Sequence, residues 1–198
     1  MSPVLAALPP EARGKLRRTV LDRGDVLFRT GASVNAMFYV VPGEVRLVRL
    51  SRAGGMVVLQ RTRNGFFAEA SLAHGAYHCD AVAAVASVVL AIPRGAFGAA
   101  LADEGFRVKW FGHLGRELRR SRTQCERLTL RTARERVIHF IETEGAAGVL
   151  QLAMTKKDWA AELGITHEAL YRTLATMQKS GEISADGEFL RLEPVIEA

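Results

Sequence analysis

TKKDWAAELGITHEALYR, which runs from Thr155 to Arg172, has the pattern of two short helices joined by a tight turn. Thr155 and Thr166 are suitable N-caps, because a threonine hydroxyl can accept a hydrogen bond from an unpaired amide of the first helical turn. Gly164 is expected to end the first helix, since glycine tolerates a left-handed conformation. The buried sides are expected to be formed by Trp159, Ala160, Leu163, Ile165, Ala169, Leu170, Leu174 and Met177. The spacing predicts a helix-turn-helix that can enter the major groove of DNA, with an ordinary helical hairpin as the alternative for this segment alone.

The residues on either side of this stretch predict a small sheet. EISADGEFLRL, from Glu182 to Leu192, places two strand-like runs around Asp186–Gly187, which is a strong hairpin signal. Leu150–Leu152 is a further candidate strand, immediately before the first helix of the motif. A helix-turn-helix followed by a hairpin predicts a winged helix.

The first half of the chain has a different pattern. Between Thr19 and Pro93, short apolar runs of strand length are separated by glycines, which mark the expected turns. These glycines are Gly24, Gly31, Gly43, Gly54, Gly55, Gly65 and Gly75. Short strands with a turn about every ten residues predict a barrel or a sandwich. Pro93 is expected to close the last strand, and a short helical turn is expected near Arg94–Leu101.

A long helix is predicted from Asp103 to about Arg131, followed by an amphipathic helix over Thr132–Glu144. The apolar positions of the long helix alternate in steps of three and four residues, which describes one narrow seam. The seam residues are Phe111, Leu114, Leu118, Ser121, Cys125 and Leu128. Such a seam suits pairing with a second copy of the chain. Packing of the helix on its own domain is the alternative.

Composition limits the class of protein. The chain has 198 residues, a net charge of +6 and a pI of about 9.8, which favours an anionic partner. Charge alone does not distinguish nucleic acid from a membrane surface or an acidic ligand. No apolar run has the roughly twenty residues that a membrane span requires. The N-terminal segment, expected to be a small helix, lacks the basic start of a signal peptide, so we expect a cytoplasmic protein with no membrane partner.

The order of these elements resembles the family of the cyclic-AMP receptor protein and the fumarate-nitrate regulator, the Crp/Fnr family. The segments that carry the resemblance are VPGEVRLV, GFFAEASL, TARERVIHFI and the helix-turn-helix itself. The resemblance implies an α+β fold: a sensory jelly-roll-like β-roll, or double-stranded β-helix, at 1–98, a dimerisation helix at 99–130 and a winged helix-turn-helix at 131–198. It also implies a homodimeric bacterial transcription regulator that binds a palindromic site in double-stranded DNA, with RNA polymerase as a candidate partner.

The resemblance assigns roles within the helix-turn-helix. The positions that read bases fall on His167, Glu168, Tyr171 and Arg172. A carboxylate there can accept from the cytosine amino group, and an arginine can bind guanine through two hydrogen bonds. His167 and Tyr171 depart from the residues that the family has at those positions. The residues expected at phosphates are Thr155, Lys156, Lys157 and Thr166.

The resemblance also locates an effector pocket that is degenerate in this chain. Family members that bind cyclic AMP have a Gly-Glu pair and, about ten residues later, an Arg-Ser pair that holds the phosphate. Here the corresponding residues are Ala68 and Glu69, then Cys79 and Asp80, and Ser121 of the long helix is assigned to the same pocket. Because an aspartate repels a phosphate, we do not expect cyclic AMP to bind. No cofactor is expected, and the four-cysteine iron-sulfur cluster is excluded by the two cysteines.

Three alternatives remain. Cys79, beside His78 and Asp80 and near His74, could be a redox-active thiol or part of a metal site, although we favour an edge-strand surface feature. A redox sensor could act through Cys79 and Cys125, or the winged helix could serve protein contacts instead of DNA. An enzyme with a cupin-like roll lacks the spaced metal ligands. The chain has no arrangement of nucleophile, base and orienting acid, so no catalytic or metal site is predicted.

Overall fold

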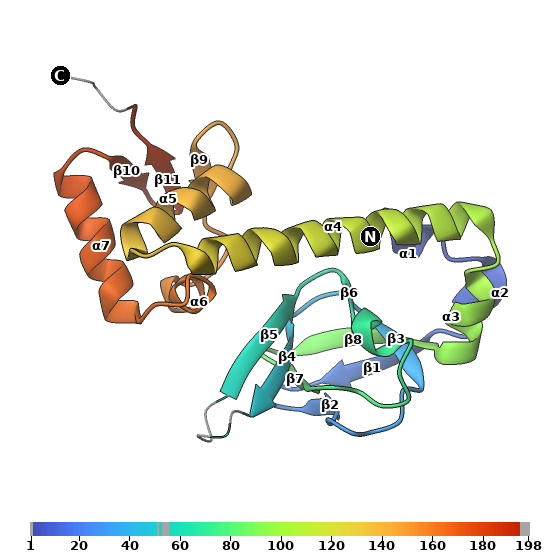
Figure 1. Cartoon of the computed structure of the whole chain (residues 1–198). Coiled ribbons are helices and arrows are strands. Elements are labelled where there is room, and N and C mark those ends of the chain that lie inside the picture. The colour runs from blue at the N-terminus through green and yellow to red at the C-terminus, as the bar shows by residue number, and fades with distance from the viewer. Residues whose placement is uncertain (1, 51, 53–55, 195–198) are drawn as a thin grey trace. The chain divides into compact units, whose positions relative to one another are not determined.

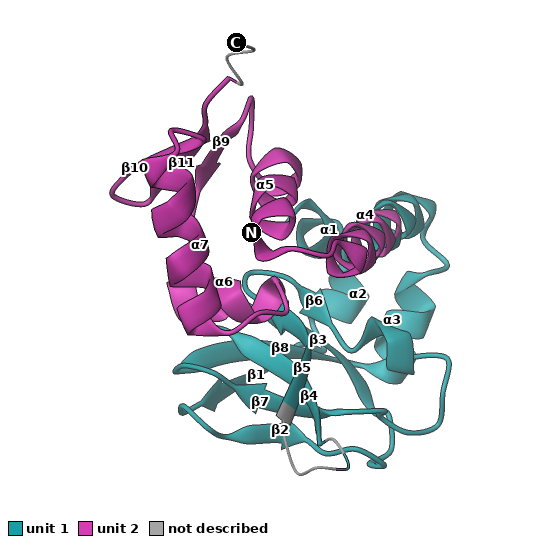
Figure 2. Ribbon diagram, turned by 60° about the vertical axis from the view of Figure 1, so that its left-hand side comes forward, with its two compact units in different colours: residues 1–114 teal, residues 115–198 magenta. Residues whose placement is uncertain are grey.

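A computed structural model describes residues 2–50, 52 and 56–194 (Figure 1). Gly54 and Gly55, which the sequence assigns to a turn, lie outside the described residues. The chain forms two compact units, Met1–Leu114 and Gly115–Ala198, and the boundary between them falls inside one long helix (Figure 2). Each unit is described by itself.

The first unit contains two antiparallel sheets of four strands each. One sheet has the order β1-β8-β3-β6, and the other has the order β2-β7-β4-β5. The strands of the first sheet are β1 (Arg17–Leu21), β3 (Ala36–Val40), β6 (Phe66–Phe67) and β8 (Ser87–Pro93). Those of the second are β2 (Val26–Phe28), β4 (Val45–Leu50), β5 (Met56–Thr62) and β7 (Asp80–Ala83). The predicted β-roll is confirmed.

Alternation along the strands gives the roll two separate cores. Phe38 and Val40 of β3 face the space between the two sheets, where they join a cluster that includes Leu47 of β4. Met37 and Tyr39, one residue out of phase, face the opposite side of the sheet and pack against helices. The second core is closed by α1 (Pro3–Ala6), α2 (Pro10–Arg13), α3 (Arg94–Ala100) and the first turns of α4 (Glu104–Thr129).

Gly43, in the VPGEV segment, is required by a close approach. It has φ 104°, and a Cβ there would lie 2.2 Å from Oγ of Ser87. The same hydroxyl accepts a hydrogen bond from the amide of Glu44 at 3.0 Å. Any larger residue at position 43 would therefore displace the turn that leads into β4.

The second unit contains the remaining part of α4, three further helices and a three-stranded sheet of order β10-β11-β9 (Figure 1). The helices are α5 (Ala133–Glu144), α6 (Lys156–Glu162) and α7 (His167–Lys179), and the strands are β9 (Val149–Gln151), β10 (Ile183–Asp186) and β11 (Phe189–Leu192). Thr132 and Glu135 form a capping box at the start of α5. The β10–β11 hairpin follows α7, so the predicted winged helix is confirmed.

Candidate nucleic-acid interface and effector pocket

The turn between α6 and α7 has the geometry that its sequence predicts. The hydroxyl of Thr155 accepts from the amide of Asp158, and that of Thr166 accepts from the amide of Ala169, each at 3.1 Å. Gly164 has φ 64°, which is the left-handed conformation expected at the end of α6. Ile165 packs partly buried against the core of this unit.

One face of α7 is buried and the other is exposed. Leu170, Leu174 and Met177 join Trp159 and Leu163 of the preceding segment in a single core. The four residues assigned to base reading are all exposed: His167, Glu168, Tyr171 and Arg172. The phosphate-contact candidates Thr155, Lys156, Lys157 and Thr166 are exposed as well. The fold therefore presents both sets to a partner.

The exposed side chains also contact one another. The rings of His167 and Tyr171 meet edge to face, with centroids 4.5 Å apart, and Nζ of Lys156 lies 5.1 Å from the centroid of the Tyr171 ring. Hydrogen bonds from its own backbone amide and from Thr166 lower the pKa of the Glu168 carboxyl. Glu168 is therefore an anionic acceptor at neutral pH, one helical turn from the cationic Arg172.

Two arginines that the sequence analysis did not single out organise this unit. Arg127 is almost fully buried, lies 4.4 Å from the centroid of the Phe140 ring, and donates to Glu144 at 3.1 Å. Arg136 donates to the carbonyls of Leu163 and Leu130, at 2.9 and 3.0 Å. In the sequence, each is an arginine within an amphipathic helix, a pattern that is typical of a solvated helix face. Nothing in that pattern indicates a structural role.

The effector-pocket candidates of the first unit lie on the segment between β6 and β7 and at the first residue of β7. Ala68 has φ 70°, so its backbone takes the left-handed conformation that glycine favours. Glu69 begins the short 3-10 helix η1 (Glu69–Ser71). Oδ1 of Asp80 accepts hydrogen bonds from both the amide and the hydroxyl of Thr30, at 2.7 and 2.9 Å. Its other carboxylate oxygen lies 3.5 Å from Arg29.

Cys79 corrects one expectation. It is not an edge-strand surface feature: the side chain is 1% exposed and belongs to the core between the two sheets. Burial raises the pKa of the Cys79 thiol, so the thiolate that redox chemistry requires is disfavoured. Strand alternation explains the error, because the residue just before β7 points between the sheets.

Ser121, the remaining residue assigned to the effector pocket, lies exposed on the part of α4 that belongs to the second unit.

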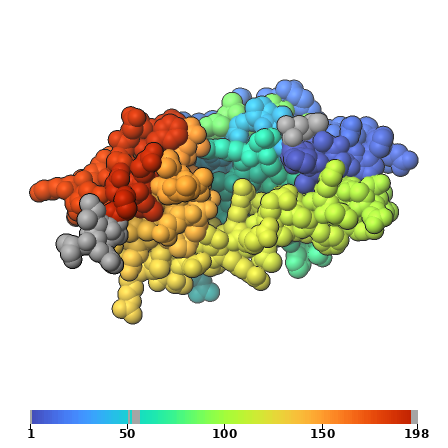
Figure 3. Space-filling model, turned by 90° about the horizontal axis from the view of Figure 1, so that it is seen from above, coloured from blue at the N-terminus to red at the C-terminus, as the bar shows by residue number. Residues whose placement is uncertain are grey.

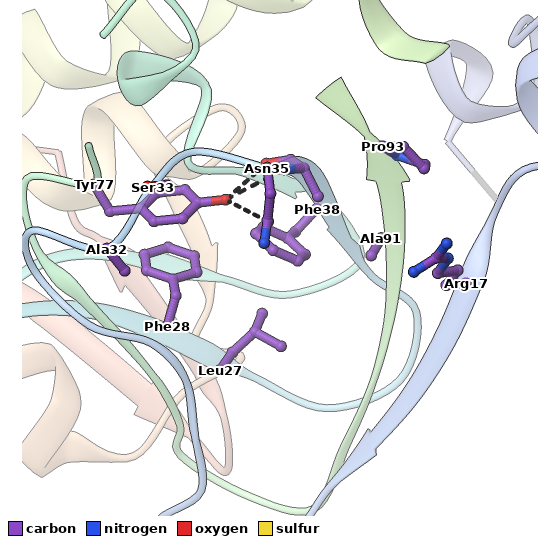
Figure 4. Close-up of a pocket in the computed structure, with 11 residues that line it drawn as sticks. Arg17, Leu27, Phe28, Ala32, Ser33, Asn35, Phe38, Tyr77, Ala91 and Pro93 are labelled. Atoms are coloured by element: carbon purple, nitrogen blue, oxygen red, sulfur yellow. Dashed lines mark hydrogen bonds between the residues drawn. The ribbon is translucent and has the colours of Figure 1, made fainter. Parts of the chain in front are cut away.

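Four aromatic side chains stack in the space between the two sheets. Phe28 stacks on Tyr77 with ring centroids 3.8 Å apart, and on Phe38 at 5.4 Å. Phe67 stacks on Phe38 at the same distance. A pocket of about 450 Å³ remains at one end of the roll (Figure 4). None of the effector-pocket residues assigned from the sequence lines it.

The seam of α4 is largely exposed. Phe111 and Leu118 are 62% and 53% exposed, and Cys125 is exposed too. Side chains of α4 project along its length (Figure 3). Two seam residues also have contacts in their own unit: Leu114 packs against the helix-side core, and the Leu128 side chain reaches Gly164. Val108, three residues before Phe111, is 63% exposed and was not among the predicted seam residues.

Two classes of site find no support in the described residues. Among residues 2–50, 52 and 56–194, no three His, Cys, Asp or Glu side chains come together as a metal site would require. No helix in the described part of the chain has the length and apolar character needed to cross a membrane.

Comparison with known proteins agrees with this architecture. Residues 18–104 match the family described as cyclic nucleotide-binding domain, and residues 135–193 match the Crp-like helix-turn-helix domain. The nitrogen fixation regulation protein FixK of Bradyrhizobium diazoefficiens is 25% identical over 177 residues, which cover 85% of this chain and 74% of FixK.

Two solved structures are similar to this chain over most of its length. FixK2 from Bradyrhizobium japonicum has a TM-score of 0.69 at 22% identity, covering 90% of this chain and 93% of its own. The catabolite activator protein of Thermus thermophilus has a TM-score of 0.54 at 25% identity, covering 97% of this chain and 94% of its own. The chain belongs to the Crp/Fnr family of DNA-binding transcription regulators, which are not enzymes.

Proposed function

We propose that this protein is a homodimeric regulator that reads a palindromic DNA site through α7 and responds to an effector other than a cyclic nucleotide, or to none. In this proposal residues 1–98 form the sensory domain, 99–130 the dimerisation helix and 131–198 the DNA-binding domain. RNA polymerase is a candidate partner. The observation that carries the proposal is that His167, Glu168, Tyr171 and Arg172 are all exposed on a helix whose other face is buried.

The chemistry of α7 supports base reading. Glu168 is anionic at neutral pH and can accept from the amino group of cytosine, while Arg172 can donate two parallel hydrogen bonds to guanine O6 and N7. Four residues apart on a helix, the two side chains lie on the same face. The two side chains therefore suit a cytosine and a guanine at neighbouring positions of one half-site.

The ends of the helices support phosphate contacts. Thr155 and Thr166 cap α6 and α7 and are both exposed, so the positive end of each helix dipole lies at the surface, where it favours a phosphate. Lys156 and Lys157 add two cations in the first turn of α6, and Lys156 also lies over the Tyr171 ring. Contacts of this kind fix the position of the protein on the duplex without reading its sequence.

Selection of binding sites from random duplex DNA tests the proposal. We expect a palindrome whose half-site centres lie about one helical turn, 34 Å, apart, since a two-fold dimer presents two copies of α7. Lys157→Ala should weaken binding to all duplexes alike and lower the salt slope by about one unit. Lys179→Ala, at the other end of α7, is the matched control. Recovery of no enriched sequence would contradict the proposal and favour the role in protein contacts.

The contacts of Asp80 and Cys79 support the absence of a cyclic-nucleotide response. Neither aspartate nor cysteine supplies a cation for a phosphate. The Asp80 carboxylate is held by Thr30 and Arg29, and Cys79 is packed in the core. Titration calorimetry with cyclic AMP and cyclic GMP at millimolar concentration should give no saturable heat. A micromolar dissociation constant for either nucleotide would overturn this part of the proposal.

A further inference from the structure

The pocket at the end of the roll lies between the two sheets. β1 and β8 contribute Arg17, Ala91 and Pro93, and the opposite wall is formed by Leu27 and Phe28. The remaining lining residues are Ala32, Ser33, Asn35, Ala36, Phe38 and Tyr77. Its volume of about 450 Å³ lies in the range of roughly 300–1,000 Å³ that is common for small-molecule sites.

The walls of this pocket suit a flat apolar group. Phe28 and Tyr77 are nearly parallel, with an interplanar angle of 14°, and Phe28 and Phe38 make an angle of 27°. The rings of Tyr77 and Phe28 lie side by side at one end of the pocket in Figure 4. Since each ring is held by its neighbours, little side-chain entropy is lost when a planar ligand packs against them.

Polar groups at the rim are few and fixed. The Tyr77 hydroxyl donates to the carbonyl of Ala36 at 3.0 Å and lies 3.4 Å from Oδ1 of Asn35 (Figure 4). Because Oδ1 of Asn35 faces that hydroxyl, the amide nitrogen of the same side chain is left as a donor. The wall thus provides one oriented hydrogen-bond donor beside an apolar surface.

Arg17 supplies the only charge among the described lining residues. It pairs with Ala91 across β1 and β8, so its side chain leaves the sheet on the pocket side, and it lies across the pocket from Tyr77 (Figure 4). It is exposed, and it forms no ion pair with another residue in the described part of the chain. A guanidinium beside an apolar pocket with no carboxylate in its lining is complementary to a ligand carboxylate.

We propose that this pocket binds a small carboxylate with a flat apolar body, held by Arg17 at its charged end and by the Phe28, Phe38 and Tyr77 rings at its apolar end. The site goes beyond the proposed function and shares no lining residue with the degenerate cyclic-nucleotide set. It requires neither DNA nor a cyclic nucleotide.

Binding of phenylacetate and of its neutral analogue phenylacetamide to the full-length protein, without DNA, tests the site. Two-dimensional amide NMR should show saturable shifts at Ser33, Asn35, Tyr77 and Ala91. The acid should bind about tenfold more tightly than the amide, as expected for one charge-assisted pair at a partly solvated position.

Arg17→Gln and Arg18→Gln form a matched pair, because the two arginines are adjacent on β1, are both exposed and point to opposite faces of the sheet. Arg17→Gln should abolish the preference for the acid, whereas Arg18→Gln should leave it unchanged. Ala32→Trp, which adds a large ring to the lining of the pocket, should weaken both compounds. Its amide spectrum should otherwise match that of the wild type, which confirms that the variant is folded.

Three results would overturn the site: no saturable shifts at the lining residues up to about 10 mM, above the millimolar range of weak specific ligands; equal affinity of acid and amide in the wild type; or equal effects of Arg17→Gln and Arg18→Gln. Because no DNA is present, any of these results would leave the proposed reading of DNA by α7 untouched.

Discussion

The guanidinium of Arg136 donates to the backbone carbonyl of Gly164 at 3.2 Å, so the first turns of α5 hold the turn of the helix-turn-helix directly. The same side chain donates to the carbonyls of Leu163, Leu130 and Leu128. These acceptors are backbone groups at helix ends, which have no partner within their own helices. One arginine therefore joins the end of α4 to the segment that sets the angle between α6 and α7.

Gly164→Ala is expected to destabilise the second unit by about 1–3 kcal/mol, from a left-handed backbone and a close contact. A Cβ at position 164 would lie 3.2 Å from Nη1 of Arg136 and 2.8 Å from the Leu128 side chain. Gly181→Ala is the matched control, because Gly181 has φ 75° but open space around it. Urea unfolding followed by Trp159 fluorescence, in a Trp110→Phe background, should show a larger loss for Gly164→Ala. Equal losses would mean that the close contacts with Leu128 and Arg136 add nothing to the cost.

Arg172→Ala is expected to cost about 1–3 kcal/mol of binding to the selected palindrome and to flatten the preference at one guanine position in each half-site. The reason is that a bidentate contact discriminates among base edges, whereas a phosphate contact does not. Affinities for a series of single-base operator variants provide the measurement. A uniform loss of affinity with unchanged base preference would show that Arg172 does not read bases.

Leu118→Glu is expected to convert the proposed dimer into monomers. Leu118 is 53% exposed in the single chain, and a partner helix along the stripe would bury it, so an uncompensated carboxylate there should cost about 3–5 kcal/mol. Val85→Glu, which changes an exposed apolar residue away from α4, is the control. Sedimentation velocity at micromolar protein concentration measures the oligomeric state of both variants. A Leu118→Glu variant that sediments as a dimer would exclude this seam.

Asp80→Asn is expected to destabilise the roll at neutral pH by about 1 kcal/mol, since it weakens charge-assisted hydrogen bonds at a partly exposed carboxylate. The hydrogen bonds from Thr30, through its amide first, lower the pKa of Asp80 in the folded state. Its contribution to stability is therefore present above the unfolded pKa of about 4 and is lost as pH falls through the lower folded pKa.

Urea unfolding from pH 7 to pH 3 checks the sign of this effect. The difference between the wild type and Asp80→Asn should shrink as the pH falls below about 4. Asp186→Asn removes an exposed carboxylate from the β10–β11 hairpin and controls for the change in net charge. A difference that stays constant over this range would mean that Asp80 is not held as a hydrogen-bonded anion.

Local sequence patterns were sufficient to predict the helices and strands and their order along the chain. The caps Thr155 and Thr166, the turn at Gly164 and the hairpin at Asp186–Gly187 were predicted because each depends on interactions within a few residues. The exposed face of α7 was also predictable, since the helical period separates His167, Glu168, Tyr171 and Arg172 from the buried leucines.

Only the tertiary structure decided which distant residues meet. Thr30 and Asp80 are fifty positions apart, and strand pairing alone brings them into hydrogen-bond distance. The same pairing placed Cys79 between the sheets and directed Arg17 toward the pocket, although local sequence indicated a surface position for the first and no particular role for the second. The physical reason is that a strand has two faces with a period of two residues, and its register with its neighbours determines which face is buried.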